Sequence, residues 1–166
     1  MDGNYPMKTD VSSQHKEELI QLVSFMLDNE EYGVEVLKVR EIIRIPPITK
    51  MPNSPHFVEG IINLRGQVIP VISMRKRCGL AEADNTTHSR IMVMDSIGGL
   101  TGFIVDGVSE VIRIRGGEIQ PPPLISGGIG QEYLTGVFNH GDRLLVFLDS
   151  DLLFSRDEQS LLVAMQ

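Results

Sequence analysis

The residues that could carry out chemistry in this 166-residue chain are few and widely separated. Its four histidines are His15, His56, His88 and His140, and Cys78 is the only cysteine. A zinc site combines Cys and His side chains at short, regular spacings. No such spacing occurs in this sequence. The sequence therefore predicts no zinc site.

Two further patterns resemble reactive sites without matching them. Asp149 and Asp151 carry carboxylates that could hold magnesium, but the end of a strand followed by a turn explains both residues. The GVSEV segment at Gly107–Val111 lacks the second glycine of a G-x-S-x-G nucleophile elbow. A hydrolase would need His, Asp and Ser clustered in one pocket, which the dispersed histidines disfavour. We expect no cofactor, no metal and no enzymatic activity.

Arg65 is the residue best placed for binding. It begins an Arg65-Gly66-Gln67 connection between two apolar runs, Ile61–Leu64 and Val68–Met74. Their β-branched residues favour strands, and Gly66 can adopt the positive φ of a tight turn, so the segment predicts a β-hairpin. An arginine at the tip can contact a partner or remain solvated. Position and residue type leave both interpretations open.

The composition limits the class of protein. Hydrophobic residues make up 42% of the chain and charged residues 22%, as in an ordinary soluble globular protein. The net charge of −7 disfavours nonspecific binding to nucleic acid or to an anionic membrane. A lone cysteine suits a reducing compartment, and no apolar run approaches the roughly 18 residues of a membrane span. These features predict a cytoplasmic protein without membrane insertion. A β-barrel nucleic-acid-binding module remains the alternative.

The elements that must position these residues are predicted to be short strands. Leu19–Leu27 has strand length and ends at an Asp-Asn turn, after which apolar residues alternate from Tyr32. Residues 36–45 are ambiguous between a short helix and an irregular strand. Pro70 lies inside an apolar run, so its strand is expected at an edge or with a bulge.

The second half of the chain continues in the same manner. Its predicted elements are a hairpin over 90–108 with a turn at Ser96–Gly99, an alternating strand at Ser109–Arg115, a long loop over 116–131, and a hairpin of Tyr133–Phe138 and Arg143–Leu148. A polar loop at Glu82–His88 is expected to separate two strand sets. Ser155 and Glu158 form a capping-box pattern that predicts a C-terminal helix.

Nine or ten short strands and one terminal helix favour an all-β barrel or sandwich. We divide the chain into a flexible tail over residues 1–16, a main domain over 17–155 and a helix over 156–166.

Four blocks of the chain resemble the CheW family, the coupling proteins of bacterial chemotaxis arrays. The blocks are Glu30–Ile42, Pro55–Leu80, Gly102–Ile114 and Glu132–Asp149, in the family's order. The resemblance implies two small five-stranded, SH3-like β-barrels packed around a shared hydrophobic core, with no catalysis. It also implies a scaffold that binds the regulatory domain of the CheA histidine kinase and the cytoplasmic tip of chemoreceptors, and that is recruited to membrane-associated arrays.

The resemblance also implies site residues. Arg65 matches the arginine that the family uses at its receptor and array contacts, and Asn63 and Gly66 frame its turn. Gly66 is expected to serve backbone shape rather than contact. Glu41 matches an acidic position implicated in coupling.

Three apolar residues extend this site. Val36, Val39 and Ile42 lie where the family has part of a hydrophobic groove for a receptor helix, although core packing would explain them equally well. The chain departs from the family at Ser73, where many relatives have aspartate. The serine removes a carboxylate that could form a local ion pair with Arg75.

Overall fold

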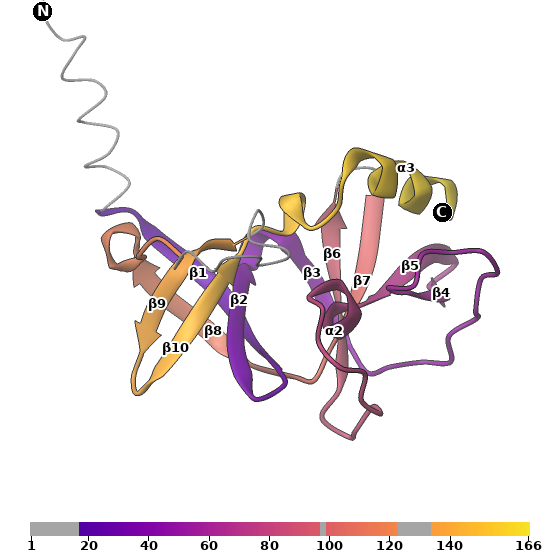
Figure 1. Cartoon of the computed structure of the whole chain (residues 1–166). Helices are drawn as coiled ribbons and strands as arrows, with labels where there is room; N and C mark the ends of the chain where they lie inside the picture. Colours follow the sequence, from indigo (N-terminus) through magenta and orange to yellow (C-terminus); the bar gives the residue numbers. More distant parts are fainter. Residues whose placement is uncertain (1–16, 97–98, 123–133) are drawn as a thin grey trace, which may run out of the picture.

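The computed structural model describes residues 17–96, 99–122 and 134–166, so the predicted tail over 1–16 lies outside the described residues. The described part contains ten strands (Figure 1). They are β1 (Leu19–Leu27), β2 (Glu30–Glu35), β3 (Val39–Ile43), β4 (Val58–Leu64), β5 (Gln67–Ser73), β6 (Arg90–Ser96), β7 (Gly99–Val105), β8 (Gly107–Arg115), β9 (Leu134–His140) and β10 (Arg143–Leu148). The helices are α2 (Met74–Arg77) and α3 (Arg156–Ala164), with 3-10 turns η1 (Val36–Lys38), η2 (Gly116–Glu118) and η4 (Ser150–Leu152).

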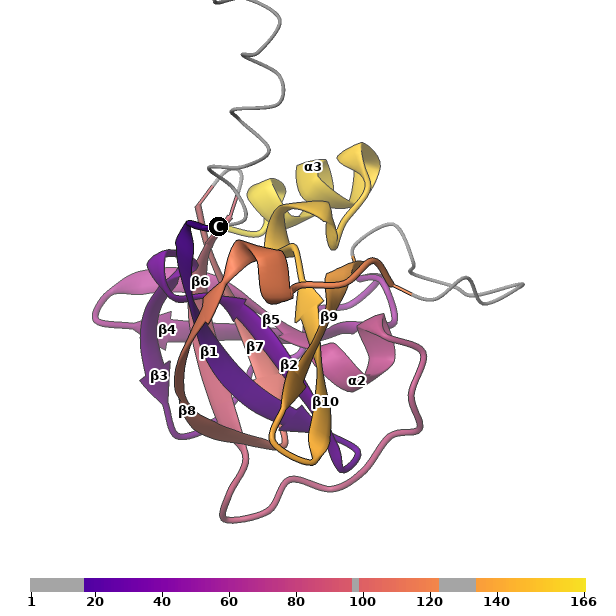
Figure 2. The same ribbon diagram turned by 90° about the vertical axis from the view of Figure 1, so that its left-hand side faces the viewer.

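The strands form two five-stranded sheets, which confirms the all-β prediction. Sheet A has the order β8-β1-β2-β10-β9 and sheet B the order β3-β6-β7-β5-β4. The two sheets lie side by side in Figure 1, and the view of Figure 2 places sheet A in front of sheet B. Most neighbouring strands are antiparallel, while the β10–β2 and β5–β7 pairs are parallel.

The predicted boundary between the two strand sets is wrong. The polar loop at Glu82–His88 connects α2 to β6, and both β5 and β6 belong to sheet B. Sheet A instead combines the N-terminal hairpin with the last three strands. A polar segment marks a connection, but it carries no information on which strands pair across it.

The first hairpin follows the prediction, and the ambiguous segment after it is resolved. β1 spans the predicted residues, and the turn residues Asp28 and Asn29 both have positive φ, at 51° and 68°. Residues 36–38 then form the 3-10 turn η1, and β3 follows with a register shift beside Arg40. The segment is therefore a helical turn followed by an irregular strand.

The strand that contains Pro70 is not an edge strand, because β5 lies between β7 and β4. Pairing with β7 begins only at Val71, one residue after the proline, so the missing N–H does not interrupt that ladder. The irregularity lies in the partner strand β4, whose register shifts between Val58 and Gly60.

In each sheet, the segment that follows one edge strand forms an antiparallel bridge with the opposite edge strand. Thr49, after β3, exchanges two backbone hydrogen bonds with Ile61 of β4, and Gln120, after β8, does the same with Val137 of β9. A Cβ built on Gly60 would lie 2.1 Å from the Thr49 oxygen. Glycine is therefore required where the two edges approach most closely.

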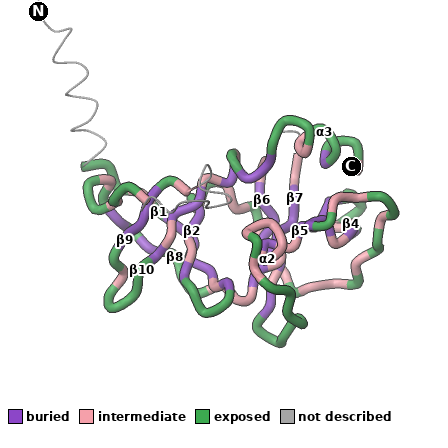
Figure 3. The backbone as a smooth tube through the Cα atoms, in the orientation of Figure 1, coloured by how far each residue is buried: buried purple, intermediate pink, exposed green. Residues whose placement is uncertain are grey.

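The core lies mainly between the two sheets, and both sheets contribute buried residues to it (Figure 3). This shared cluster includes Phe25 and Leu27 from sheet A and Phe57 and Phe103 around sheet B. Smaller clusters lie within each sheet, and Phe147 belongs to that of sheet A. The shared core is therefore confirmed.

The terminal helix α3 begins where the capping box predicts. The Ser155 hydroxyl accepts the N–H of Glu158 at 3.1 Å, and the Glu158 carboxylate accepts the N–H of Ser155 at 2.8 Å. Leu162 anchors the helix in the shared core. In Figure 1 the helix lies over one end of sheet B.

Candidate functional site

The tip of the β4–β5 hairpin is a two-residue turn. Arg65 and Gly66 both have positive φ, at 52° and 86°, which confirms the predicted role of Gly66 in the backbone. A side chain at Gly66 would meet no atom within 4 Å, so backbone conformation rather than space requires glycine there. The Asn63 carboxamide oxygen accepts the N–H of Gly66 at 2.8 Å. The turn thereby holds Arg65 at the end of the hairpin.

Arg65 and Glu41 form a bidentate ion pair. Two guanidinium nitrogens of Arg65 donate to the two carboxylate oxygens of Glu41 at 2.6 and 2.5 Å. Glu41 lies on β3, so the pair links the two edge strands of sheet B. The sequence identified both residues as site candidates without predicting that they pair.

The pair remains accessible to a partner. The Arg65 side chain is 71% exposed and that of Glu41 is 28% exposed. The hydrogen bond from Arg65 lowers the pKa of Glu41, and the same bond raises the pKa of Arg65. Both groups are therefore charged at neutral pH, and the outer surface of the guanidinium faces solvent.

The three apolar candidates do not line one hollow. Val36 and Val39 are partly buried against the shared core, whereas Ile42 is 41% exposed. Ile42 borders a hollow of about 340 Å³ that Met26 and Val108 also line. Val36 instead borders a second hollow of about 330 Å³, together with Leu19 and the 86% exposed Leu37. Residues of both sheets line the first hollow, whereas the second is lined by β1, the end of β2 and η1, the turn that leads to sheet B.

Met26, Val108 and Leu37 were missed from the sequence, but an internal repeat would have identified Val108. The segment VREIIRI at 39–45 recurs as VSEVIRI at 108–114, with only two of the seven positions changed. These segments begin at β3 and within β8, the corresponding edge strands of the two sheets. Val108 is therefore the equivalent of Val39.

The repeat extends to the hairpins. GIINLRG at 60–66 corresponds to GVFNHGD at 136–142, with the first glycine and the asparagine in common. At the second tip, His140 Nε2 lies 3.6 Å from the Glu110 carboxylate, and its Nδ1 lies 3.1 Å from Glu31. Glu110 is the repeat equivalent of Glu41. Both hairpin tips thus contact a glutamate on the opposite edge strand.

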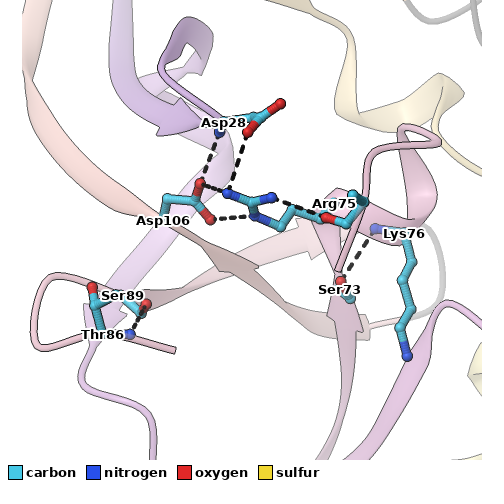
Figure 4. Close-up of polar contacts among 8 residues, drawn as sticks. Asp28, Ser73, Arg75, Lys76, Thr86, Ser89 and Asp106 are labelled. Atoms are coloured by element: carbon cyan, nitrogen blue, oxygen red, sulfur yellow. Dashed lines mark hydrogen bonds and ion pairs between the residues drawn. The ribbon is translucent and has the colours of Figure 1, made fainter. Parts of the chain in front are cut away.

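Ser73 does not remove the ion pair of Arg75. Its hydroxyl caps α2 by accepting the N–H of Lys76 at 3.2 Å (Figure 4). The Arg75 guanidinium pairs instead with the carboxylate of Asp106, through bonds of 2.9 and 2.6 Å. The expectation that serine at this position deprives Arg75 of a partner is wrong, because the partner comes from the connection between β7 and β8.

The described residues contain no group of three or more His, Cys, Asp or Glu side chains arranged to hold a metal ion. Asp149 accepts the N–H of Asp151 at the start of η4, and the Asp151 carboxylate pairs with Lys38 at 2.9 Å. Across residues 17–96, 99–122 and 134–166, no helix is both long and apolar enough to cross a membrane.

Comparison with known proteins identifies one family. Residues 21–158 match the model of the CheW-like domain. The chain is 36% identical over 146 residues to the chemotaxis protein CheW of Treponema pallidum, covering 86% of each chain. It is 34% identical over 141 residues to CheW of Klebsiella aerogenes, covering 85% of each.

A solved structure supports the same relationship. The crystal structure of the scaffolding protein TtCheW from Thermoanaerobacter tengcongensis superposes with a TM-score of 0.77 at 35% sequence identity. The match covers 85% of this chain and 96% of that protein.

Proposed function

Because this chain belongs to the family of CheW-like domains, a family of chemotaxis coupling adaptors, we propose that it couples chemoreceptors to a CheA-type histidine kinase. The partners are the cytoplasmic tip of the receptors and the regulatory domain of the kinase. The family match over residues 21–158 carries this proposal. Receptor contact would recruit the chain to membrane-associated arrays. The match gives no support to the nucleic-acid-binding alternative.

The contact site in this proposal is the β4–β5 tip with its partner on β3. Arg65 offers an exposed, permanently charged guanidinium, and Glu41, Asn63 and Gly66 hold it in place. Since the Arg65 backbone is fixed by the turn, little further ordering is needed when a partner carboxylate or carbonyl approaches. The site is thus preorganised for a polar contact.

The apolar part of the site is the junction of the two sheets. One hollow is lined by Ile42, Met26 and Val108. Val36 borders the other hollow, and Val39 lies between Val36 and Ile42 in the sequence. An amphipathic helix can place apolar anchors at i, i+3 or i+4 and i+7 into such a surface. The surrounding charged residues, including Arg90, would form a polar rim.

Coupling in this proposal is thermodynamic. The adaptor binds receptor and kinase at separate surfaces, and a receptor state that binds it with different affinity biases the kinase conformation. No chemical step by the adaptor is required.

Replacement of Arg65 by alanine tests the site. In a reconstituted complex of receptor, kinase and this chain, Arg65→Ala is expected to reduce receptor control of kinase activity while the melting temperature stays close to that of the wild type. Arg113→Ala, which removes another exposed arginine from β8, is the matched control and should retain control. Full receptor control with Arg65→Ala would contradict the assignment of the site.

A further inference from the structure

The described strands pass from one sheet to the other at two crossovers, and each crossover borders a candidate binding hollow. The first crossover is η1, between β2 and β3, and it contains Val36 and Leu37. The second is Asp106, between β7 and β8, two residues before Val108. The shape of the sheet junction therefore depends on how these two short segments are held.

The second crossover is fixed by a network of hydrogen bonds around Asp106 (Figure 4). Arg75 donates to both of its carboxylate oxygens, and the N–H of Asp28 donates to one of them at 2.8 Å. The backbone N–H of Asp106 donates to the carbonyl of Met26 at 3.0 Å. Arg75 comes from α2 beside sheet B, whereas Asp28 and Met26 belong to the first hairpin of sheet A. The network thus joins the two sheets directly beside the hollow.

The Arg75 side chain is also fixed, by partial burial and by a further hydrogen bond. Its side chain is only 17% exposed, and its remaining terminal nitrogen donates to the carbonyl of Ala81 at 2.9 Å. Partial burial opposes ionisation of Asp106, but the hydrogen bonds from Arg75 and from the N–H of Asp28 outweigh it and lower the pKa of Asp106. The pair is therefore fully charged and geometrically constrained at neutral pH.

The first crossover has a counterpart with the charges reversed. Lys38, in η1, pairs with Asp151 in η4, the turn that follows β10 as α2 follows β5. In the repeat of the two hairpins, Asp151 is the equivalent of Arg75. In each case an ion pair connects the crossover to the helical turn that follows a hairpin: η4 after the β9–β10 hairpin, and α2 after the β4–β5 hairpin. At the two crossovers the charges of the ion pair are therefore in opposite places.

We propose that Arg75 and Asp106 form a clasp that positions Met26 and Val108 against Ile42 and so sets the shape of the receptor-binding groove. This proposal rests on the proposed function for the identity of the partner. Arg75 is a positioning residue, because it acts through Asp106 and does not line the hollow that contains Ile42.

Variants of the clasp test the proposal in the free protein first. Arg75→Gln and Asp106→Asn should each shift the NMR methyl resonances of Met26, Ile42 and Val108. Lys76→Gln is the matched control, since Lys76 lies on the same helix but pairs with Glu59 and Glu82, which are outside sheet A. Unchanged methyl resonances in both clasp variants, or equal changes in the control, would overturn the proposal.

Binding provides the second readout. The full chain and its variants are titrated with a chemoreceptor signalling-tip fragment and, separately, with the regulatory domain of the kinase. The clasp variants should bind the receptor fragment roughly 5-fold or more weakly, as for a typical coupling between sites, and the kinase domain with unchanged affinity. The double variant should lose no more affinity for the receptor fragment than either single variant, because both substitutions remove the same Arg75–Asp106 pair.

The outcomes separate the two proposals. If the wild-type chain binds neither fragment, the proposed function fails, while the methyl resonances still decide whether the clasp shapes the junction. If Arg75→Gln does not fold, Arg75→Lys, which keeps the charge but loses the bidentate geometry, replaces it. Loss of affinity for both fragments to the same extent would indicate a purely structural role and would overturn the proposal.

Discussion

The two hairpin tips of this protein occupy equivalent positions in the repeat but end in different chemistry. In sheet B, Arg65 is permanently charged, 71% exposed, and paired with Glu41 on the opposite edge strand. In sheet A, His140 lies between the exposed Glu110 and Glu31, whose side chain is 5% exposed. One arrangement of strands thus presents a guanidinium to solvent at one tip and covers a buried carboxylate at the other.

The comparison shows which parts of the repeat serve the fold and which can serve binding. The close approach of edge strands at Gly60 recurs at Gly136, and the tip asparagine recurs at Asn139. The two glycines allow the close backbone approach of the edge strands in both sheets. The residues at the tip differ, so function is expected to depend on the tips and stability on the shared positions.

The largest effect is expected inside sheet A. Phe147→Ala removes a ring that is 5% exposed and should lower the free energy of unfolding by roughly 3–5 kcal/mol. Val71, its repeat equivalent in sheet B, is fully buried but smaller, so Val71→Ala should cost less. Chemical denaturation of both variants measures the difference. An unchanged melting temperature for Phe147→Ala would exclude its role in the core.

The glycines at the edge contacts should rank next. A Cβ at Gly60 would overlap the Thr49 oxygen, and one at Gly136 would lie 2.5 Å from the Gln120 oxygen. Each alanine variant should destabilise by about 1–3 kcal/mol, with Gly60→Ala the more severe because its φ of +148° also disfavours a side chain. Gly66→Ala, which meets no neighbour, is the control for backbone strain alone. Equal unfolding energies for Gly60→Ala and Gly66→Ala would refute the steric argument.

A smaller effect is expected from the contact that distinguishes sheet A. His140→Ala should destabilise by about 1–2 kcal/mol, because it leaves the buried Glu31 carboxylate without its hydrogen bond from the ring. Glu110→Gln alters the exposed side of the same contact and should change the unfolding energy little. If the two variants were equally destabilised, burial would not be the cause.

Most of the strands could be predicted from the sequence because alternation and turn residues are local signals. The Arg65-Gly66 turn and the capping box at Ser155 are clear examples. The pairing of strands could not be predicted, since it depends on contacts between residues far apart, as the misplaced boundary at Glu82–His88 and the interior position of Pro70 show.

The residues of the candidate site could be named from the sequence, but their geometry could not. Family resemblance identified Arg65 and Glu41, while their ion pair depends on the two edges of sheet B meeting. The Arg75–Asp106 clasp joins residues 31 positions apart. The sequence around Ser73 did not indicate that Asp106 would be the partner of Arg75. The repeat of VREIIRI was the one sequence feature that could have placed Val108 beside the site.

The smallest effect concerns acid stability and contrasts the clasp with the exposed tip. The pKa values of both Asp106 and Glu41 are lowered by an arginine hydrogen bond, so each contributes stability that is present above its unfolded-state pKa. For Asp106 that value is 3.8, and the contribution should be lost as pH falls below 3.8 through the folded-state pKa. Asp106→Asn should therefore flatten the melting-temperature curve between about pH 5 and pH 2. Glu41→Gln should flatten it less, because solvent screens the exposed pair. A larger change for Glu41→Gln than for Asp106→Asn would show that the exposed Arg65–Glu41 pair contributes more pH-dependent stability than the clasp, contrary to this prediction.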